Sequence, residues 1–392
     1  MTVGLVIVLL MMGVLLYAWV IYPLAMRARP RPPGPVPSGT DLPAVAVVLS
    51  AHNEESVIER RLENLAALDY PSDKLRVYVG VDGGTDATAR MAGDWALTHA
   101  GVRVLVTAQN RGKAAMLKDL VELGAEPVLA LTDANTLFDR DAVRRLVAVL
   151  DDPHVGGVCG RLVFRRACEA GTGETSYWDW ETDLKQKESD LDSCLGANGA
   201  IYAVRRDLFW RDLPANTIID DFVIGMKVRE QGRRFVYEPA ARASEDLPAT
   251  VKDEWRRRVR IGAGAFQALA LCRRCLSPGF GRFAWAFWSH KVLRWFTPHL
   301  LLLLSVVSFM LLCGGSGWTG GRFHAWPAAL VTLMLGAGVA GRLCRESSSR
   351  LVRPFVLAHY FLVMQAALFV GFLRFCRGNL SGTWQRTERR GE

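Results

Sequence analysis

Carboxylate and amide side chains cluster in three short polar runs, each of which directly follows an apolar segment. The runs are Ser50–Glu55, Asp82–Asp86 and Asp133–Asn135. Carboxylate and amide oxygens are hard ligands of the kind that bind Mg²⁺ or Mn²⁺. Each run alone has an ordinary explanation, because Asp-Gly-Gly is common in turns and Glu54 suits the first turn of a helix. Their repeated position after successive apolar segments is what favours a shared site.

The apolar segments before these runs have the pattern of buried parallel strands. Continuous apolar residues are typical of strands that are covered on both faces. The predicted strands are 45–49, 75–81, 102–106 and 128–132, and the predicted helices are 54–68, 84–99 and 112–124. Strand–helix repeats of this spacing predict a parallel sheet with helices on both faces. Ligands bind at the carboxyl ends of such strands, so the polar runs are expected to meet on one edge of the sheet.

Charge is distributed unevenly along the 392 residues, which carry 48 Lys+Arg and 39 Asp+Glu. From residue 251 onward there are 20 Lys+Arg against 5 Asp+Glu. The stretches without any of these residues are 3–26, 295–321, 323–341 and 354–373. Each is close to the roughly 20 residues that a membrane-spanning helix needs. Basic residues beside apolar segments are typical of the cytoplasmic side of a membrane and of lipid phosphate, which argues against nucleic acid as the partner.

These patterns divide the chain into six predicted regions. They are an N-terminal transmembrane anchor at 1–26, a Pro-rich linker at 27–43, a cytoplasmic α/β domain at 44–250, amphipathic interfacial helices at 251–295, two transmembrane helices at 296–341, and a cytoplasmic loop, an interfacial or re-entrant helix and a C-terminal tail at 342–392. No charge precedes the first apolar run and three Arg residues follow it. The positive-inside rule therefore predicts an uncleaved anchor with its N-terminus outside.

The apolar segment 354–373 is expected not to cross the membrane. Four crossings would place the Arg-rich tail from residue 374 outside, against the positive-inside rule. This segment begins with Pro354 and contains His359, Tyr360 and Gln365, which makes it the least uniformly apolar of the four. We expect it to lie along the cytoplasmic interface, or to enter and return. Three crossings are few for a closed polymer channel in one chain, which favours short products or an oligomer.

The order of the motifs resembles family 2 glycosyltransferases of the nucleotide-sugar-binding A-type fold. The resemblance is to the membrane-embedded branch, with cellulose, hyaluronan and poly-N-acetylglucosamine synthases, and it covers nearly the whole chain. It implies a Rossmann-like mixed α/β sheet domain joined to an α-helical membrane domain. It also implies donor contacts at Ala51, Asn53, Glu54, Asp82, Lys113 and Asp133. The implied metal ligands are Asp133 and Asn135, and Asn135 stands where the family has a second Asp.

The middle of the chain resembles the acceptor side of these enzymes. The stretch 195–206 resembles their acceptor loop and the strand that follows, which implies acceptor contacts at Asn198, Gly199 and Asp220. Asp220-Asp221 resembles the motif whose last Asp is the general base in inverting transfer. By position that residue is Asp221, which would take the proton of the acceptor hydroxyl as it attacks the anomeric carbon. A paired Asp can also cap the predicted helix 222–231, with Asp220 as the cap while Asp221 faces the site.

Two elements near the C-terminus complete the resemblance. Processive members carry Gln-x-x-Arg-Trp, which aligns here with Arg257–Ile261. Donor contacts are implied at Arg257 and Arg260, but Ile261 replaces the Trp that stacks on the acceptor sugar, which argues against processive elongation. Arg256 and Arg258, beside them, fit a solvated or lipid-facing surface equally well. The implied donor contacts Trp384 and Arg389 belong to a Trp-x-x-Thr-x-Arg/Lys element that gates the donor site.

The residues and the resemblance together predict a membrane-anchored inverting glycosyltransferase of the inner membrane, with its site at the cytoplasmic face. Its donor would be a nucleoside-diphosphate sugar, expected to be a UDP-sugar, with Mg²⁺ or Mn²⁺ neutralising the leaving diphosphate. Its acceptor would be a lipid-linked or growing glycan. The expected partners also include membrane lipids and allow an oligomer. The alternative is a catalytically silent subunit that binds a nucleotide or a synthase partner.

Overall fold

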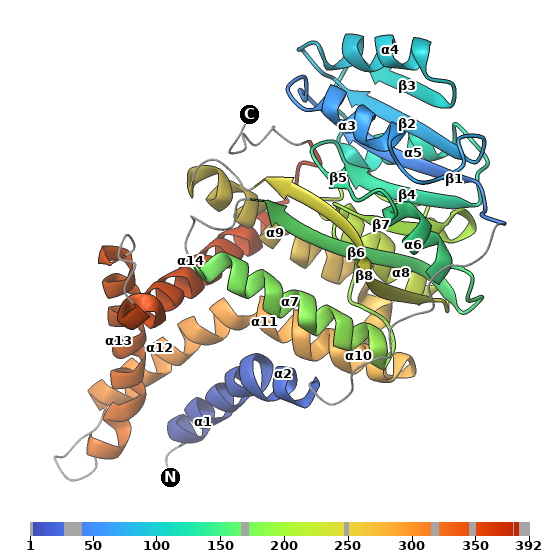
Figure 1. The fold of residues 1–392 in the computed structure, drawn as a ribbon. Helices are drawn as coiled ribbons and strands as arrows, with labels where there is room; N and C mark the ends of the chain where they lie inside the picture. The colour runs from blue at the N-terminus through green and yellow to red at the C-terminus, as the bar shows by residue number, and fades with distance from the viewer. Residues whose placement is uncertain are drawn as a thin grey trace.

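The structure, a computed structural model, describes residues 3–26, 41–165, 172–246, 251–314, 321–344, 350–378 and 380–383. One eight-stranded mixed sheet forms the centre of the chain, in the order β3-β2-β1-β4-β7-β6-β8-β5 (Figure 1). The strands are β1 (Val45–Ala51), β2 (Leu75–Asp82), β3 (Val102–Thr107), β4 (Val128–Asp133), β5 (Leu137–Phe138), β6 (Val155–Arg165), β7 (Tyr202–Arg205) and β8 (Arg234–Asp246). The four strands predicted from the sequence are all present, and they form the parallel half, β3-β2-β1-β4.

The other half of the sheet is mixed. Strand β7 pairs antiparallel with both β4 and β6, and β8 runs parallel to β6 and antiparallel to β5. The mixed sheet confirms the expected Rossmann-like α/β domain. It also places the polar residues after β1, β2 and β4 on one edge, because these three strands are neighbours and run in the same direction.

Helices cover both faces of the sheet, as the continuous apolar strands require. One core packs the odd-numbered residues of β1, such as Val47, against α3 (Ile58–Ala66) and α6 (Ala142–Val149). The other core packs Val48 of the same strand against α5 (Lys113–Val121) and α8 (Asp220–Glu230). Helix α4 (Thr88–Thr98) lies between β2 and β3 in the chain. Alternate residues of one strand therefore belong to different cores.

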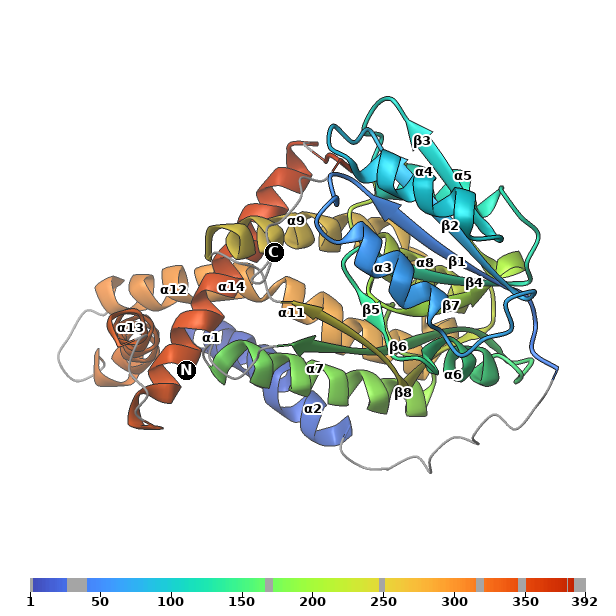
Figure 2. The same cartoon turned by 45° about the horizontal axis from the view of Figure 1, so that its top comes forward.

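The second core continues into the helices beside the sheet domain. It includes Tyr22 from the N-terminal helix and Phe287 from a π-helical segment, Phe287–Val292, that follows α10 (Arg282–Ala286). The elements on this side are α1 (Val3–Leu16), α2 (Tyr22–Ala25), α7 (Thr172–Leu191), α9 (Val251–Leu271), α11 (Leu293–Trp295), α12 (Thr297–Gly314), α13 (Gly321–Leu343) and α14 (Arg353–Cys376). Figure 2 shows these helices gathered on one side of the sheet domain, with α7 running along that side. The sheet domain and the apolar helices are thus one packed unit.

Among the described residues, three helical segments are long and apolar enough to cross a membrane. They are Val3–Ala25, Trp326–Leu343 and Arg353–Cys376, and a fourth candidate is the pair Arg282–Trp295 and Thr297–Cys313, which is bent by 56°. By length and composition α14 is therefore a candidate span, although residues 354–373 were expected to stay at the interface. The close packing of the carboxyl-terminal end of α14 against α9 is relevant to the expectation that residues 354–373 stay at the interface. A Cβ on Gly371 would lie 2.6 Å from the backbone nitrogen of Ala263 in α9, so this end is pressed against the helix that enters the sheet domain.

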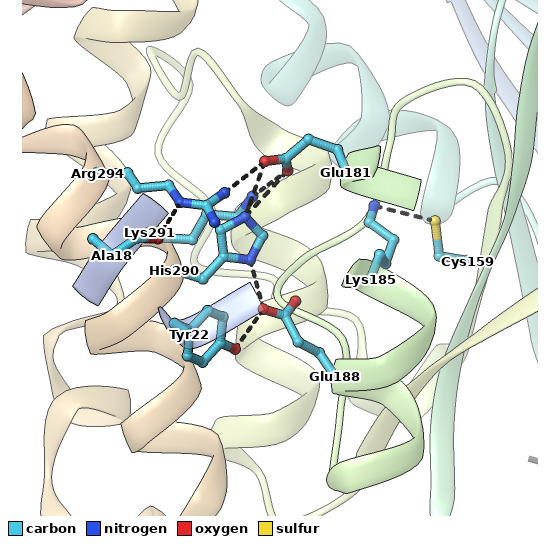
Figure 3. A network of polar contacts seen from close by, with 9 residues as sticks. All are labelled: Ala18, Tyr22, Cys159, Glu181, Lys185, Glu188, His290, Lys291 and Arg294. Carbon is cyan, nitrogen blue, oxygen red and sulfur yellow. Dashed lines mark hydrogen bonds and ion pairs between the residues drawn. The ribbon is translucent and has the colours of Figure 1, made fainter. Parts of the chain in front are cut away.

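A buried network of polar groups joins the N-terminal helix to α7 and to the segment 287–295 (Figure 3). Glu188 accepts a hydrogen bond from the Tyr22 hydroxyl at 2.8 Å and contacts His290 Nδ1 at 2.5 Å. About two turns before Glu188 on α7, Glu181 forms ion pairs with Lys291 at 3.1 Å and Arg294 at 3.0 Å. These cations outweigh the effect of burial and hold the pKa of Glu181 well below its usual range. The network fixes α7 against the anchor.

Candidate active site

The turn after β1 is locked to the loop after β2. Asn53 has a positive φ of 56°, which ends the strand abruptly and turns its side chain toward the neighbouring loop. Its Oδ1 accepts a hydrogen bond from the backbone of Thr85 at 2.8 Å, and the backbone nitrogen of Glu54 donates to Thr88 Oγ1 at 2.8 Å. Ala51 is fully buried at the end of β1. The predicted donor residues after β1 therefore lie together, beside the loop that begins at Asp82.

Asp82 is buried, and its carboxylate organises the segment that leads to Lys113. Its Oδ1 accepts hydrogen bonds from Thr107 Oγ1 and from the backbone of Arg111, both at 3.0 Å. Its Oδ2 accepts one from the backbone of Gly112 at 2.7 Å. Gly112 has a φ of 95°, a conformation that glycine adopts without strain, and it directly precedes α5. Asp82 thereby sets the start of α5 and the position of Lys113, while its contact with a nucleotide stays a prediction.

Lys113 lies at the centre of three carboxylates. Its Nζ is 2.6 Å from Asp133 Oδ1 and 3.6 Å from Asp220 Oδ2. The three carboxylates outweigh the effect of burial on this ammonium and raise its pKa. Asp220 is more deeply buried, and burial, with Asp221 and Asp133 nearby, raises its pKa to about 6 although Lys113 opposes the shift. Burial likewise raises the pKa of Asp221.

Gly199 is the point at which these groups meet the predicted acceptor loop. A Cβ on this glycine would lie 2.9 Å from Asp133 Oδ2, 3.4 Å from Lys113 Nζ and 3.5 Å from Asp221 Oδ2. The loop is held by Asn198, whose Nδ2 donates to the Gly160 carbonyl at 3.1 Å. The strands β1, β4 and β7, with helices α5 and α8, thus bring the predicted base, the predicted metal ligand and the predicted acceptor loop to one place.

The two aspartates at the start of α8 differ in a way that the sequence did not indicate. Asp220 is the first residue of the helix, the capping position is occupied by Ile219, and no side chain caps the helix there. The possibility that Asp220 acts as the cap is therefore wrong, because its carboxylate is turned toward Lys113 instead. Asp221 accepts a hydrogen bond on Oδ1 from the backbone of Phe222 at 2.8 Å, while its Oδ2 faces Gly199. One oxygen is thus held and the other is directed into the site.

The arginines of α9 divide between the site and the membrane helices. Arg260 is partly buried, and burial with the nearby Arg257 lowers its pKa while the fields of Asp220, Asp133 and Asp221 oppose that shift. It therefore lies within electrostatic reach of the carboxylates. Arg257 is 3.6 Å from Glu254. Arg258 contacts the Tyr360 hydroxyl and its guanidinium lies 4.9 Å from that ring, so it ties α9 to α14. Ile261, in place of the stacking Trp, is exposed.

The described end of the C-terminal tail reaches the site. A Cβ on Gly112 would lie 2.7 Å from the carbonyl oxygen of Gly382, and one on Gly382 would lie 2.5 Å from the carbonyl oxygen of Ala215. The tail thus passes between the residue before Lys113 and the loop before α8. The predicted gating residues Trp384 and Arg389 lie outside the described residues.

A metal ion would have to be shared with the donor. Within the described ranges, no group of three or more His, Cys, Asp and Glu side chains is arranged to hold a metal alone. Asp133 and Asn135 are both partly exposed at the end of β4, and between them Ala134 is buried. One carboxylate and one amide oxygen beside a diphosphate are a donor set that suits Mg²⁺ or Mn²⁺, ions that keep some ligands from substrate and water. The residues fit such an ion.

Substitution of Gly199 by Ala is expected to reduce transfer while the protein still folds. The new methyl group would press on the short Asp133 side chain, which has little freedom to move away. Displacement of a catalytic group by about 1 Å can cost up to about 10²-fold in rate, so we expect a loss of at least about 10-fold. The control is Gly93→Ala in α4, where a Cβ would meet nothing within 4 Å. Equal transfer rates for the two variants would show that Gly199 is not at the reacting centre.

The fold and this arrangement of groups define the class of protein. A mixed sheet with acidic residues at the ends of β1, β2 and β4, an acceptor loop and an aspartate pair is the A-type fold of nucleotide-sugar glycosyltransferases. The family model described as Glycosyltransferase like family 2 matches residues 43–264, more than half of the chain. The chain belongs to this family.

Known relatives are similar over more than half of the chain. The probable glycosyltransferase YdaM of Bacillus subtilis is 28% identical over 241 residues, 57% of this chain and 56% of that protein. Poly-beta-1,6-N-acetyl-D-glucosamine synthase of Staphylococcus aureus is 25% identical over 235 residues, 58% of this chain and 56% of that protein. The chain thus spans about half the length of these curated relatives.

A solved structure shares the fold over almost the whole chain. A mannosyltransferase from Pyrobaculum calidifontis, in complex with GDP-Man and Mn2+, has a TM-score of 0.69 at 24% identity. The match covers 95% of this chain and 97% of that one, so it includes the helices beside the sheet domain. This agreement confirms the expected combination of an A-type domain with a helical domain.

Proposed function

We propose that the protein is a membrane-anchored inverting glycosyltransferase that moves a sugar from a nucleoside-diphosphate sugar to a lipid-linked or glycan acceptor at the cytoplasmic face. The observation that carries this proposal is the convergence of Lys113, Asp133 and Asp221 on Gly199 in the acceptor loop. The reaction needs positive charge for the leaving diphosphate and a base for the acceptor hydroxyl. Both occur within one small volume.

Each group has a role that its surroundings support. The acceptor hydroxyl would lie beside Gly199 and give its proton to Asp221 Oδ2, since Oδ1 is held by the backbone of Phe222. Lys113 would neutralise the negative charge that develops as the bond between the anomeric carbon and the phosphate oxygen breaks. A divalent ion held by Asp133, Asn135 and the diphosphate would supply further neutralisation when bound. Arg260 is a second cation within reach of the same charge.

The donor is expected to be a UDP-sugar. GDP-mannose is the most important alternative donor to test beside it. The mannosyltransferase with the same fold was solved with GDP-Man and Mn2+, whereas the synthase relative is named for a polymer of N-acetylglucosamine. None of the described side chains distinguishes uracil from guanine. The donor class is therefore identified by comparing transfer from UDP-sugars with transfer from GDP-mannose.

The alternative is a catalytically silent subunit that binds a nucleotide or a synthase partner. The presence of Asp82, Asp133 and Asp221 together favours catalysis, since binding alone does not need a base at the acceptor loop. Purified protein given a nucleotide sugar separates the two hypotheses. An enzyme releases nucleoside diphosphate by transfer or slow hydrolysis, whereas a silent subunit binds the nucleotide sugar and releases none.

The tail from residue 374 is expected to lie in the cytoplasm. Gly382 contacts the loop before α8 and the residue before Lys113, so the tail lies on the side of the catalytic domain. The test uses intact cells, a membrane-impermeant maleimide and a chain in which Cys344 and Cys376 are replaced by Ser. We expect labelling at native Cys313, which is exposed near the far end of α12, and none at the thiol introduced by Thr383→Cys. Labelling of that introduced thiol in intact cells would place the catalytic domain outside.

A further inference from the structure

Lys185, in the middle of α7, is a cation beside the acceptor loop that the proposed reaction does not use. Its Nζ lies 3.8 Å from Cys159 Sγ. No carboxylate in the described part of the chain forms an ion pair with it, although it is only partly exposed. An ammonium removed from water is costly unless an anion compensates it, and a neutral thiol compensates it poorly. The position therefore suits an anion from outside the chain.

Other charges on α7 differ from Lys185 in having partners of opposite sign. Glu181, one turn before it, is paired with Lys291 and Arg294, and Lys187 pairs with Asp183 on the outer surface. In Figure 3 the ammonium of Lys185 is joined to Cys159 Sγ and not to the Glu181 group. The carboxylates of Glu181 and Asp183 thus have other ion-pair partners, and the ammonium of Lys185 contacts a strand of the sheet.

The contacts of Cys159 connect Lys185 to the acceptor loop. Cys159 Sγ also accepts a hydrogen bond from the backbone nitrogen of Asn198 at 3.4 Å. Gly199 follows, and there Asp221 and Asp133 converge. Burial lowers the pKa of Lys185, but the charges around it, among them the carboxylates of Asp221 and Glu181, outweigh burial and raise its pKa, so it is charged at neutral pH. Lys113 is thus the cation paired with the donor-side carboxylates, and Lys185 is a second cation on the acceptor side.

The same helix also contacts the N-terminal anchor. Trp180 on α7 stacks parallel to Trp19 with ring centroids 6.4 Å apart, and the Arg294 guanidinium lies 4.4 Å from the Trp180 ring. Lys185 is five residues further on, which is about 7.5 Å along a helix axis. An acceptor that comes from the membrane would pass this part of α7 before it reaches Gly199.

We propose, on the basis of the proposed function, that Lys185 binds the phosphate of a lipid-linked acceptor. A phosphate would supply the direct ion-pair partner that Lys185 lacks among the described residues, and it would hold the neighbouring part of the acceptor beside Asn198 and Asp221. A Lys ammonium is a compact point charge that binds phosphate well. A neutral glycan would leave this cation without an ion-pair partner, so the site distinguishes an anionic acceptor from a neutral one.

The experiment measures transfer by purified protein in phospholipid vesicles that contain either a sugar linked to a polyisoprenyl phosphate or the same sugar linked directly to the neutral polyisoprenol, so that both acceptors carry the hydroxyl that Asp221 would deprotonate. With a saturating nucleotide sugar, we expect transfer to the phosphate-linked sugar and none to the neutral one. Lys185→Met should raise the KM for the phosphate acceptor by at least about 10-fold and leave the KM for the donor unchanged. Lys185→Arg should retain part of the affinity. The control is Lys187→Met on the exposed side of the same helix, which should behave as wild type.

The possible results separate this proposal from the proposed function. Transfer by wild type to a neutral glycan, with the same acceptor KM after Lys185→Met, would overturn the role of Lys185 and leave the glycosyltransferase activity intact. A loss in kcat without any change in acceptor KM would also overturn it. If Lys185→Met does not fold, as judged by nucleotide binding, Lys185→Gln provides the same measurement. Failure of wild type to use any donor with any acceptor would remove both proposals.

Discussion

Replacement of Asp221 by Asn is expected to reduce sugar transfer by about 10²-fold or more while nucleotide-sugar binding survives. The amide keeps the size of the carboxylate, and its oxygen still accepts the hydrogen bond from the backbone of Phe222, but it has no basicity for the acceptor proton. Transfer is measured as labelled product formed at saturating donor. Binding is measured separately as the donor dissociation constant by calorimetry.

The matched control for Asp221 is Asp207→Asn, which makes the same chemical change on an exposed residue away from the site. It should leave both transfer and binding unchanged. The split between binding and transfer distinguishes loss of a base from loss of structure. Transfer by Asp221→Asn within about threefold of wild type would mean that another group takes the proton, and Asp220, whose pKa is raised to about 6, is the next group to test.

Removal of divalent metal is expected to abolish transfer, and Asp133→Asn should reduce it by about 10²-fold or more. Asp133 is a carboxylate that both holds Lys113 and stands beside Asn135 at the end of β4. Its loss leaves only a neutral pair of ligands and an ammonium whose remaining ion pair is with Asp220 at 3.6 Å. The measurement is transfer in chelator, followed by titration with Mn²⁺ or Mg²⁺. Wild type should recover fully, whereas Asp133→Asn should need a higher metal concentration and reach a lower maximum.

Asp139→Asn, on the exposed end of the following turn, serves as the control and should recover like wild type. Full transfer by wild type in excess chelator would contradict the proposed metal and the role of Asp133 in holding it. In that case Asp133 would serve only to position Lys113 through their ion pair. Lys113 alone would then neutralise the charge of the leaving diphosphate.

The parallel half of the sheet could be predicted because its strands are continuous apolar runs. Positions 45–49, 75–81, 102–106 and 128–132 all lie within observed strands. The first two helix starts were each predicted four residues too early. Asn53 adopts a positive φ, and Asp86 accepts a hydrogen bond from the backbone of Thr88 at 3.0 Å, so the loops before α3 and α4 continue further than helical periodicity indicates. Such local bonds compete with helix formation.

The sequence was enough to predict which residues lie at the site, but not which of their side chains contact one another. The spacing of Lys113 and Asp133 gives no sign that the ammonium lies 2.6 Å from the carboxylate, because this contact depends on how α5 packs beside β4. The role of α7 was missed for a related reason. Its charged residues look like a solvated helix in the sequence, and only the fold turns Glu181 toward Arg294 and Lys185 toward Cys159. Long-range polar contacts of this kind have no local signal.

The measurement that tests the central claim most directly is a panel of nucleotide sugars incubated with membranes that contain this protein. The panel includes UDP-linked sugars and GDP-mannose, and it records both released nucleoside diphosphate and labelled product. The account predicts that one donor class gives both signals in equal amounts, that chelator removes them, and that membranes with Asp221→Asn protein lack them at the same protein level. Tight binding of a nucleotide sugar with neither signal from any donor would contradict the account and identify the protein as a silent, nucleotide-binding subunit.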